Sequence, residues 1–328
     1  MTPLAFGVAA GLGCALFSSI SYLVSRHHGT RRPGGSRRLL VLAHLLMGLV
    51  CCPVAWWLVP ATVPLSDLAS FSVWSACVVS TGSYFVGQAC VFHVLTRADA
   101  SRLSPLLGLK IIALALLVTV VLRQPLAPLQ WLAVGLCGTA AVVLQRGGSG
   151  IPPKPLALLA FSCLCFAIAD LGIVALIDAL EATVPISRLQ AGSLAMALTY
   201  VLGGVIVLPL VVGEYRRQQP PNAGDWLAAA EYSAAWLTAM VSLYACIGTV
   251  GVVLSTILQS TRGVMSVALG AVLAHLGWHD LESRVDRIMF IKRLAAAVLM
   301  TAAIAAYVWS AATFESRDQF RRPFLIDR

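Results

Sequence analysis

Ten stretches of predominantly apolar residues dominate this sequence, and they restrict what the chain can fold into. A helix needs roughly 20 apolar residues to cross the hydrocarbon core of a bilayer. Only 11% of the residues are charged, against roughly 25% in soluble domains. The runs are continuously apolar and lack the alternation of barrel strands. The sequence therefore predicts an all-α integral membrane protein with ten transmembrane helices.

The predicted spans follow one another with few long connectors. They cover residues 4–25, 39–58, 71–95, 103–122, 128–145, 156–178, 186–212, 232–256, 262–278 and 294–312. Only the connectors 26–38 and 213–231 exceed a tight turn, and neither is long enough to bury a core of its own. No soluble catalytic domain fits between the spans, so we expect that the protein is not an enzyme.

Several function classes are disfavoured by the polar residues. The net charge of +9 comes mainly from arginines in short connectors, which is typical of membrane anchoring and argues against a nucleic-acid partner. The nine cysteines lie in apolar runs without CxxC spacing, so we expect neither a metal site nor a disulfide framework. The GxxxxGK[ST] pattern does not occur, so ATP would have to act through another subunit. We expect no cofactor.

The second half of the sequence repeats the first. At an offset of 160, Tyr84 falls on Tyr244, Ser101 on Thr261, and Arg102 on Arg262; beyond the next hairpin the offset is 162, where residues 132–143 fall on 294–305. This predicts two five-helix repeats, residues 1–147 and 155–313, followed by a polar tail, residues 314–328. Because five spans return the chain to the opposite side, the second repeat is expected to enter the membrane inverted.

This organisation resembles the EamA-type transporters of the drug/metabolite transporter superfamily. The likeness covers nearly the whole chain and includes the segments "ADASRLSPLLGLKIIALAL" and "QSTRGVMSVALGAVLAHLG". The family pattern has a proline early in the fourth and ninth helices and an acidic residue before the fifth and tenth. Pro105 fits, whereas its counterpart is Met265; the first hairpin lacks the acid, and the second has Asp280 and Glu282. The resemblance implies a transporter, and leaves the solute and the coupling ion open.

Two charged residues lie inside predicted spans. Asp170 is past the middle of the sixth span and Lys110 is about seven residues into the fourth. An ionised group at the bilayer centre costs at least about 2.5–3.5 kcal/mol, so it should face a cavity or a partner. Asp170 is a candidate proton carrier or cation partner, or else makes a structural hydrogen bond. Lys110 either binds an anionic group or Asp170, or extends its stem to the interface.

Other polar residues in the spans are candidates for binding a solute. We expect hydrogen bonds to the solute from side chains whose polar ends need a partner in a dry environment, namely Ser21, Tyr22, Tyr84, Gln88, Gln190 and Tyr244. Small and hydroxyl residues also promote helix packing, which remains the alternative for Ser21. Arg102 and Arg262 are expected at helix ends, as gate or interface residues or as membrane anchors.

The sequence thus predicts a secondary-active exporter of a small polar or amphipathic metabolite that works by alternating access, coupled to a proton or another ion. Its expected location is a bacterial inner membrane. The alternative is a membrane enzyme or lipid-handling protein that uses interfacial arginines or histidines such as His275 and His279. Basic residues favour termini outside, with 15 Lys and Arg in the odd connectors against 7 on the other side of the membrane; the family resemblance favours termini inside. The oligomeric state stays open.

Overall fold

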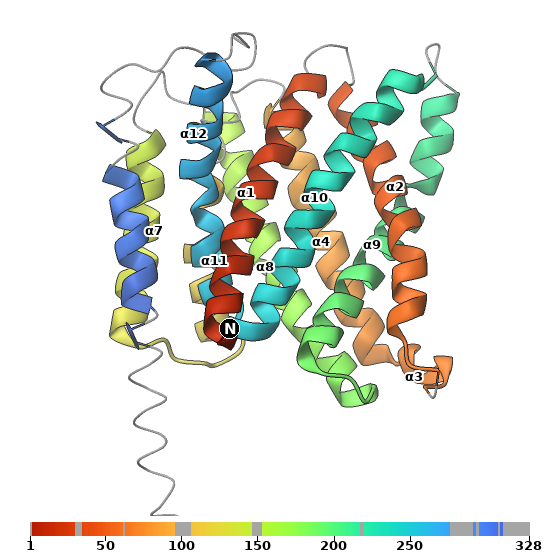
Figure 1. The fold of residues 1–328 in the computed structure, drawn as a ribbon, viewed down its shortest axis with the longest axis horizontal. Helices are drawn as coiled ribbons and strands as arrows, with labels where there is room; N and C mark the ends of the chain where they lie inside the picture. Colours follow the sequence, from red (N-terminus) through yellow and green to blue (C-terminus); the bar gives the residue numbers. More distant parts are fainter. Residues whose placement is uncertain are drawn as a thin grey trace, which may run out of the picture.

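The computed structural model describes residues 2–29, 35–61, 63–95, 106–145, 153–216, 220–275, 291–292, 295–307 and 309–310. These residues form helices and no strand (Figure 1). The helices are α1 (Pro3–Gly29), α2 (Gly35–Leu58), α3 (Leu65–Leu68), α4 (Phe71–Leu95), α6 (Lys110–Val120), α7 (Pro128–Gln145), α8 (Pro153–Thr183), α9 (Arg188–Tyr215), α10 (Ala223–Val250), α11 (Val252–Ser260) and α12 (Arg262–His275). A further apolar helix covers Ala295–Tyr307.

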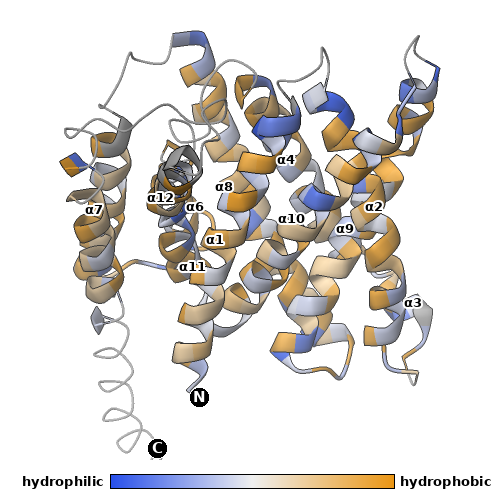
Figure 2. Ribbon diagram, turned by 45° about the horizontal axis from the view of Figure 1, so that its top comes forward, coloured by the Kyte–Doolittle hydropathy of each residue, from blue (hydrophilic) through white to orange (hydrophobic). Residues whose placement is uncertain are grey.

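The helices have the length and composition of membrane spans. Within the described ranges, seven are long and apolar enough to cross a bilayer, and Lys110–Val120, Pro128–Val143 and Ala295–Tyr307 are shorter apolar helices. Large apolar side chains such as Trp57 and Phe71 are more than four-fifths exposed, as expected for a surface that faces lipid. Figure 2 shows hydrophilic residues gathered mainly at helix ends. The predicted all-α integral membrane protein is therefore confirmed.

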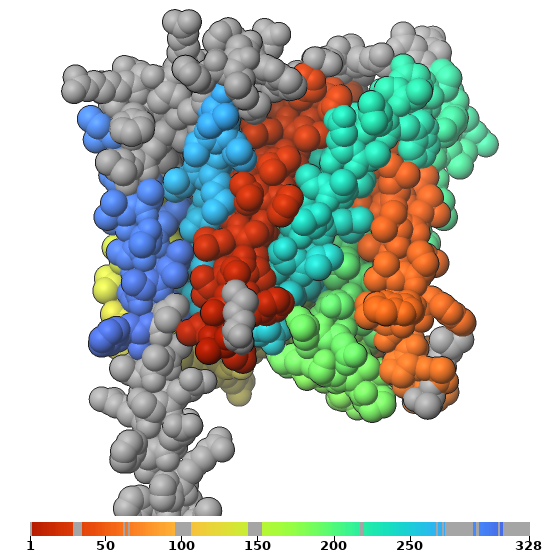
Figure 3. All heavy atoms as spheres, in the orientation of Figure 1, coloured from red at the N-terminus to blue at the C-terminus, as the bar shows by residue number. Residues whose placement is uncertain are grey.

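Three helix pairs form the most extensive contacts of the bundle: α4 with α8, α1 with α10, and α2 with α9. Small residues let some of these backbones approach closely, as is common where membrane helices pack. A Cβ atom added to Gly172 of α8 would lie 2.9 Å from the Cα of Ser80 in α4. On the face shown in Figure 3, α1 lies between α10 and α12, and it contacts both.

Successive long helices run in alternating directions. In Figure 1, α1 begins at the bottom, α2 returns there and leads into α3, and α4 climbs again. The short loop between α8 and α9 also lies at the bottom, so α8 descends and α9 climbs. The end of α10 meets α11 at the bottom, and α12 continues upward. Therefore α1, α2 and α4 run opposite to α8, α9 and α10, respectively.

A glycine ends α10 earlier than the sequence predicted. Gly251 has φ 81° and ψ 166°, a combination that is essentially restricted to glycine. The eighth span was expected at 232–256, whereas α10 is Ala223–Val250 and α11 begins at Val252. The next apolar span, Val252–Gly270, has Arg262 near its middle, and Arg262 is also the first residue of α12, as predicted for a helix end.

Candidate functional site

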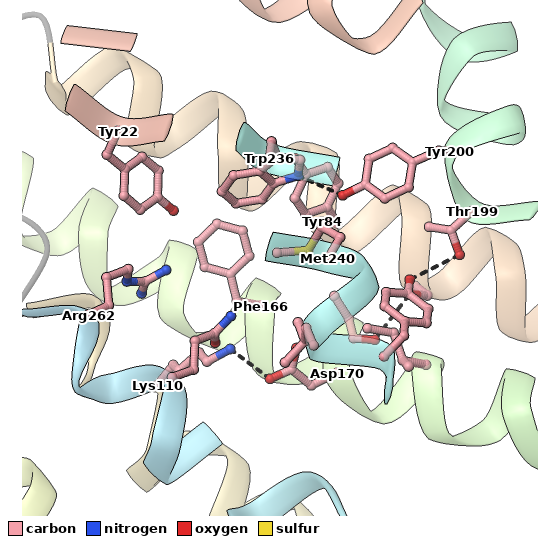
Figure 4. Close-up of a pocket in the computed structure, with 16 residues that line it drawn as sticks. Tyr22, Tyr84, Lys110, Phe166, Asp170, Thr199, Tyr200, Trp236, Met240 and Arg262 are labelled. Carbon is pink, nitrogen blue, oxygen red and sulfur yellow. Dashed lines mark hydrogen bonds and ion pairs between the residues drawn. The ribbon is translucent and has the colours of Figure 1, made fainter. Parts of the chain in front are cut away.

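A cavity lies at the centre of the bundle, bordered by α1, α4, α6 and α8 to α12 (Figure 4). The room inside it is about 40 Å³, well below the roughly 300–1,000 Å³ that is typical of small-molecule sites. Its walls are formed by Tyr22, Ser80, Tyr84, Lys110, Phe166, Ala169, Asp170, Ile173, Thr199, Tyr200, Trp236, Met240, Leu243, Tyr244, Gln259 and Arg262.

An ion pair crosses the lower part of the cavity in Figure 4. Lys110 Nζ, at the first residue of α6, donates to Asp170 Oδ2 of α8 at 2.8 Å. Thr256 Oγ1 of α11 donates to the same oxygen at 3.3 Å. Lys110 and Asp170 are 5% and 4% exposed. Each charge therefore has the partner that a group removed from water requires.

Arg262 is a second buried cation in the wall. The residue is 4% exposed, and its guanidinium carbon lies 5.2 Å from the centre of the Tyr22 ring, within the range of a cation–π contact. Its Nε atom is buried and makes no hydrogen bond, and no carboxylate pairs with the side chain anywhere in the described part of the chain. The adjacent Gln259 donates through Nε2 to Cys14 Sγ at 3.4 Å, while its Oε1 is buried without a partner.

Aromatic side chains form the upper wall. Trp236 Nε1 donates to the Tyr200 hydroxyl at 2.6 Å, and the Tyr84 ring lies 5.9 Å from Trp236 and 6.2 Å from Phe166 between ring centres. Such separations are typical of favourable aromatic pairs. In Figure 4, Tyr84, Trp236 and Tyr200 lie on the side away from Lys110 and Arg262, and Phe166 lies between them and the two cations.

Hydroxyl groups of the two repeat-related tyrosines are fixed by neighbours. His44 Nδ1 contacts the Leu40 carbonyl oxygen at 2.7 Å; because a carbonyl only accepts, Nδ1 carries the hydrogen. Nε2 of a neutral ring then accepts, so the Tyr84 hydroxyl donates to it at 3.1 Å. The Tyr244 hydroxyl donates to Thr199 Oγ1, also at 3.1 Å. Tyr84 and Tyr244 therefore have defined positions in the wall.

The structure brings together six of the residues that the sequence singled out. Those that line the cavity are Tyr22, Tyr84, Lys110, Asp170, Tyr244 and Arg262. Ser21 is buried and donates to Ser18 O of its own helix at 2.8 Å. Gln88 donates to the Tyr232 hydroxyl at 2.9 Å, and Gln190 forms a capping box with Ser187 at the start of α9. None of these three is in the cavity wall.

Some predicted residues lie outside the described part of the chain. These are Arg102, His279 and the tail from residue 314. The backbone of His275 is described, but its side chain is not. The histidine alternative is therefore not tested. Among the residues that the structure does describe, no group of three or more His, Cys, Asp or Glu side chains is arranged to hold a metal ion.

Several residues of the cavity wall were not predicted from the sequence. Phe166, Tyr200, Trp236, Met240, Thr199 and Gln259 all border the cavity. Tyrosine and tryptophan in the middle of a span were the available signal, because their polar ends need partners when buried. Phe166 and Met240 carry no such signal, since the same side chains occur throughout lipid-facing surfaces.

A bundle of apolar helices around a buried, partly charged cavity is the architecture of a membrane transport protein. Residues 5–146 match the sequence model of the EamA-like transporter family. The first half of the chain is therefore similar to that family, and the resemblance predicted from the sequence is confirmed.

Comparison with solved structures extends the likeness to both halves. One structure, titled "Crystal structure of protein", aligns with a TM-score of 0.67 at 17% identity, covering 94% of this chain and 98% of that one. At this identity the alignment shows the fold alone. The comparison with curated proteins gives no match.

Proposed function

We propose that this chain is a secondary-active transporter that carries a small polar or amphipathic metabolite through the central cavity by alternating access. Its two inverted repeats are residues 1–147 and 155–313, and residues 314–328 form a tail outside both. The proposed direction is export across a bacterial inner membrane. The family match over the first repeat supports the transport class.

The packing of the helices supports the inverted repeat. Suppose that α1, α2 and α4 of the first repeat correspond to α8, α9 and α10 of the second. The contact between α4 and α8 then has the contact between α10 and α1 as its counterpart, and the contact between α2 and α9 is its own counterpart. The contact between α6 and α8 likewise has the contact between α12 and α1 as its counterpart. A two-fold axis in the membrane plane requires these correspondences, and it also requires corresponding helices to run in opposite directions, as they do in Figure 1.

The observation that carries the proposal is the buried ion pair between the repeats. Lys110 belongs to the first repeat and Asp170 to the second, and their side chains meet inside the cavity at 2.8 Å. Ionisable groups inside a membrane are costly, and they commonly mark the path of an ion or a solute. Because the pair joins the two repeats, its formation or loss can be coupled to a change in how the repeats pack against each other.

The transport cycle follows from this pair. Asp170 changes charge by taking up and releasing a proton, and protonation removes its attraction for Lys110. The Lys110 ammonium then becomes free to interact with the solute. Tyr84 and Tyr244, one from each repeat, contact the solute in both packings of the halves. Coupling arises because the proton and the solute act on the same ion pair.

An uptake experiment tests this function. Purified protein in proteoliposomes is given a panel of radiolabelled metabolites with and without an imposed proton gradient. We expect gradient-dependent uptake of at least one solute, and its loss in Asp170→Asn with an unchanged size-exclusion profile. Asp178→Asn is the matched control, because Asp178 lies on the same helix but is exposed and paired with Arg188. Unchanged uptake by Asp170→Asn would refute the assignment.

A further inference from the structure

The cavity wall has more positive than negative groups. Among the described residues that border the cavity, Lys110 and Arg262 are cationic and Asp170 is the one carboxylate, so the formal charges of these residues sum to +1. Lys110 and Thr256 both donate to one oxygen of this carboxylate, Asp170 Oδ2. Asp170 therefore balances Lys110, and no other described residue of the wall supplies a negative charge for Arg262.

Arg262 is built into the cavity and does not reach an interface. It lies near the middle of the span Val252–Gly270, the residue is 4% exposed, its guanidinium packs on the face of Tyr22, and its buried Nε atom has no hydrogen-bond partner. A buried charge without a counter-charge is unfavourable. Among the described residues, no carboxylate forms an ion pair with this cation.

The two cations face the same space. In Figure 4, Arg262 and Lys110 lie on one side of the cavity, and Thr199 and Tyr200 lie on the other. The unpartnered amide atom of Gln259, beside Arg262 in the wall, is its acceptor oxygen Oε1, so it does not contribute to anion binding. An arginine and a lysine that face one space are typical ligands for a carboxylate.

The rest of the wall fixes the other end of the solute. Tyr84, Phe166, Tyr200 and Trp236 present ring surfaces beyond the two cations, with Met240 beside them (Figure 4). Flat, apolar walls favour a ring or another unsaturated group. A cationic amine would meet two like charges and one carboxylate among the described residues of the wall.

We propose that the transported solute is an organic anion, in which a carboxylate binds to Arg262 and Lys110 and an aromatic body packs against Tyr84, Phe166 and Trp236. This inference rests on the proposed transport function and names its substrate class. When the solute carboxylate binds, it supplies the counter-charge that Arg262 lacks.

Four small probes test the class by changing one property at a time. Phenylacetate carries the anion and the ring, phenylacetamide is its neutral analogue, phenethylamine is a cation, and acetate lacks the ring. Binding is measured by the shift in thermal unfolding of the detergent-purified protein at millimolar concentrations. We expect phenylacetate to bind at least about tenfold more tightly than the other three, as one strong charge-assisted contact allows.

Two variants locate the carboxylate. Arg262→Gln should weaken phenylacetate binding by about tenfold or more, a typical effect of losing a charge-assisted hydrogen bond, and should leave the weak binding of phenylacetamide unchanged. Arg188→Gln is the matched control, because this arginine lies outside the cavity and pairs with Asp178 and Glu181. Arg262→Lys should retain part of the affinity, which shows that a loss in Arg262→Gln comes from the charge and not from misfolding.

The outcomes separate this inference from the transport function. Equal binding of the three aromatic probes, a preference for phenethylamine, or binding of none of them overturns the organic-anion class. If the metabolite panel yields uptake of a neutral or cationic solute, transport stands and the anion class fails. If phenylacetate binds through Arg262 but neither it nor any panel solute crosses the proteoliposome membrane, the anion site stands and the transport function fails.

Discussion

Gly48 of α2 and Gly204 of α9 bring two helix backbones into direct contact. A Cβ atom added to Gly48 would lie 2.8 Å from the Cα of Gly204, and one added to Gly204 would lie 3.0 Å from the Cα of Gly48. Close approach through small residues is a common way for membrane helices to associate. Under the proposed repeat, α2 and α9 correspond to each other, so this crossing joins equivalent helices of the two halves.

The glycine crossing gives a stability prediction. Gly48→Ala should lower the free energy of unfolding by about 1–3 kcal/mol, the usual effect of overpacking, because its neighbour is backbone that cannot rotate away. Gly135→Ala, on α7 with nothing within 4 Å of the added atom, should leave stability unchanged or raise it. Unfolding titrations in mixed detergent micelles measure both, and an equal loss in the two variants contradicts the prediction.

The ion pair gives a second prediction, through a double-mutant cycle. Lys110→Met and Asp170→Leu should each destabilise the protein by about 3–5 kcal/mol, because each leaves one charge buried without its partner. The double variant should recover much of that loss, since apolar residues then replace both charges. The same titrations provide the three values. Additive losses in the double variant would show that the two residues do not interact.

Backbone conformation at Gly251 gives a third prediction. Gly251→Ala should cost about 1–3 kcal/mol, because a side chain is strained at this φ and ψ, although no atom lies within 4 Å of the added Cβ. Gly248→Ala is the control: this glycine is inside α10, and its nearest neighbour, Arg188 O, is at an ordinary 3.5 Å. Thermal unfolding in detergent distinguishes the two, and equal stability of both variants would argue against strain at Gly251.

Trp236 provides an optical test of the cavity. Its indole borders the cavity and donates to the Tyr200 hydroxyl, so phenylacetate bound beside it should change its fluorescence. Trp236→Phe should abolish most of the phenylacetate-dependent change in intrinsic fluorescence. Trp57→Phe should preserve it, because Trp57 is exposed on the lipid-facing surface. A response that survives in Trp236→Phe would place the probe elsewhere.

Part of the site follows from the sequence because charge inside an apolar span is rare. Lys110 and Asp170 are visible as the charges within predicted spans, and both border the cavity. Tyr84 and Tyr244 are visible through the repeat. Sequence alone does not show that Lys110 and Asp170 are neighbours, since this depends on how α6 packs against α8.

Arg262 shows where the sequence argument fails. Its span was expected to start at residue 262, which places the arginine at an interface. A helix, α12, does begin at Arg262, but the apolar span that contains it starts earlier, at Val252 of α11, directly after Gly251. The sequence around Gly251 is apolar on both sides, and a lone glycine in such a run does not reveal a chain reversal. Gln190 shows the opposite error, because its place three residues after Ser187 is the pattern of a capping box.

The joint at Gly251 has a mechanical consequence. α10 carries Trp236 and Tyr244, and the helices after the joint carry Gln259 and Arg262. Only Gly251 separates α10 from α11, so a change in the angle between these helices involves a few adjacent backbone torsions. The helix with Trp236 and Tyr244 and the helices with Gln259 and Arg262 would therefore rotate about the same point. In the proposed transport cycle, a wider angle would separate the groups that bind the two ends of the solute, so that one rotation would release it.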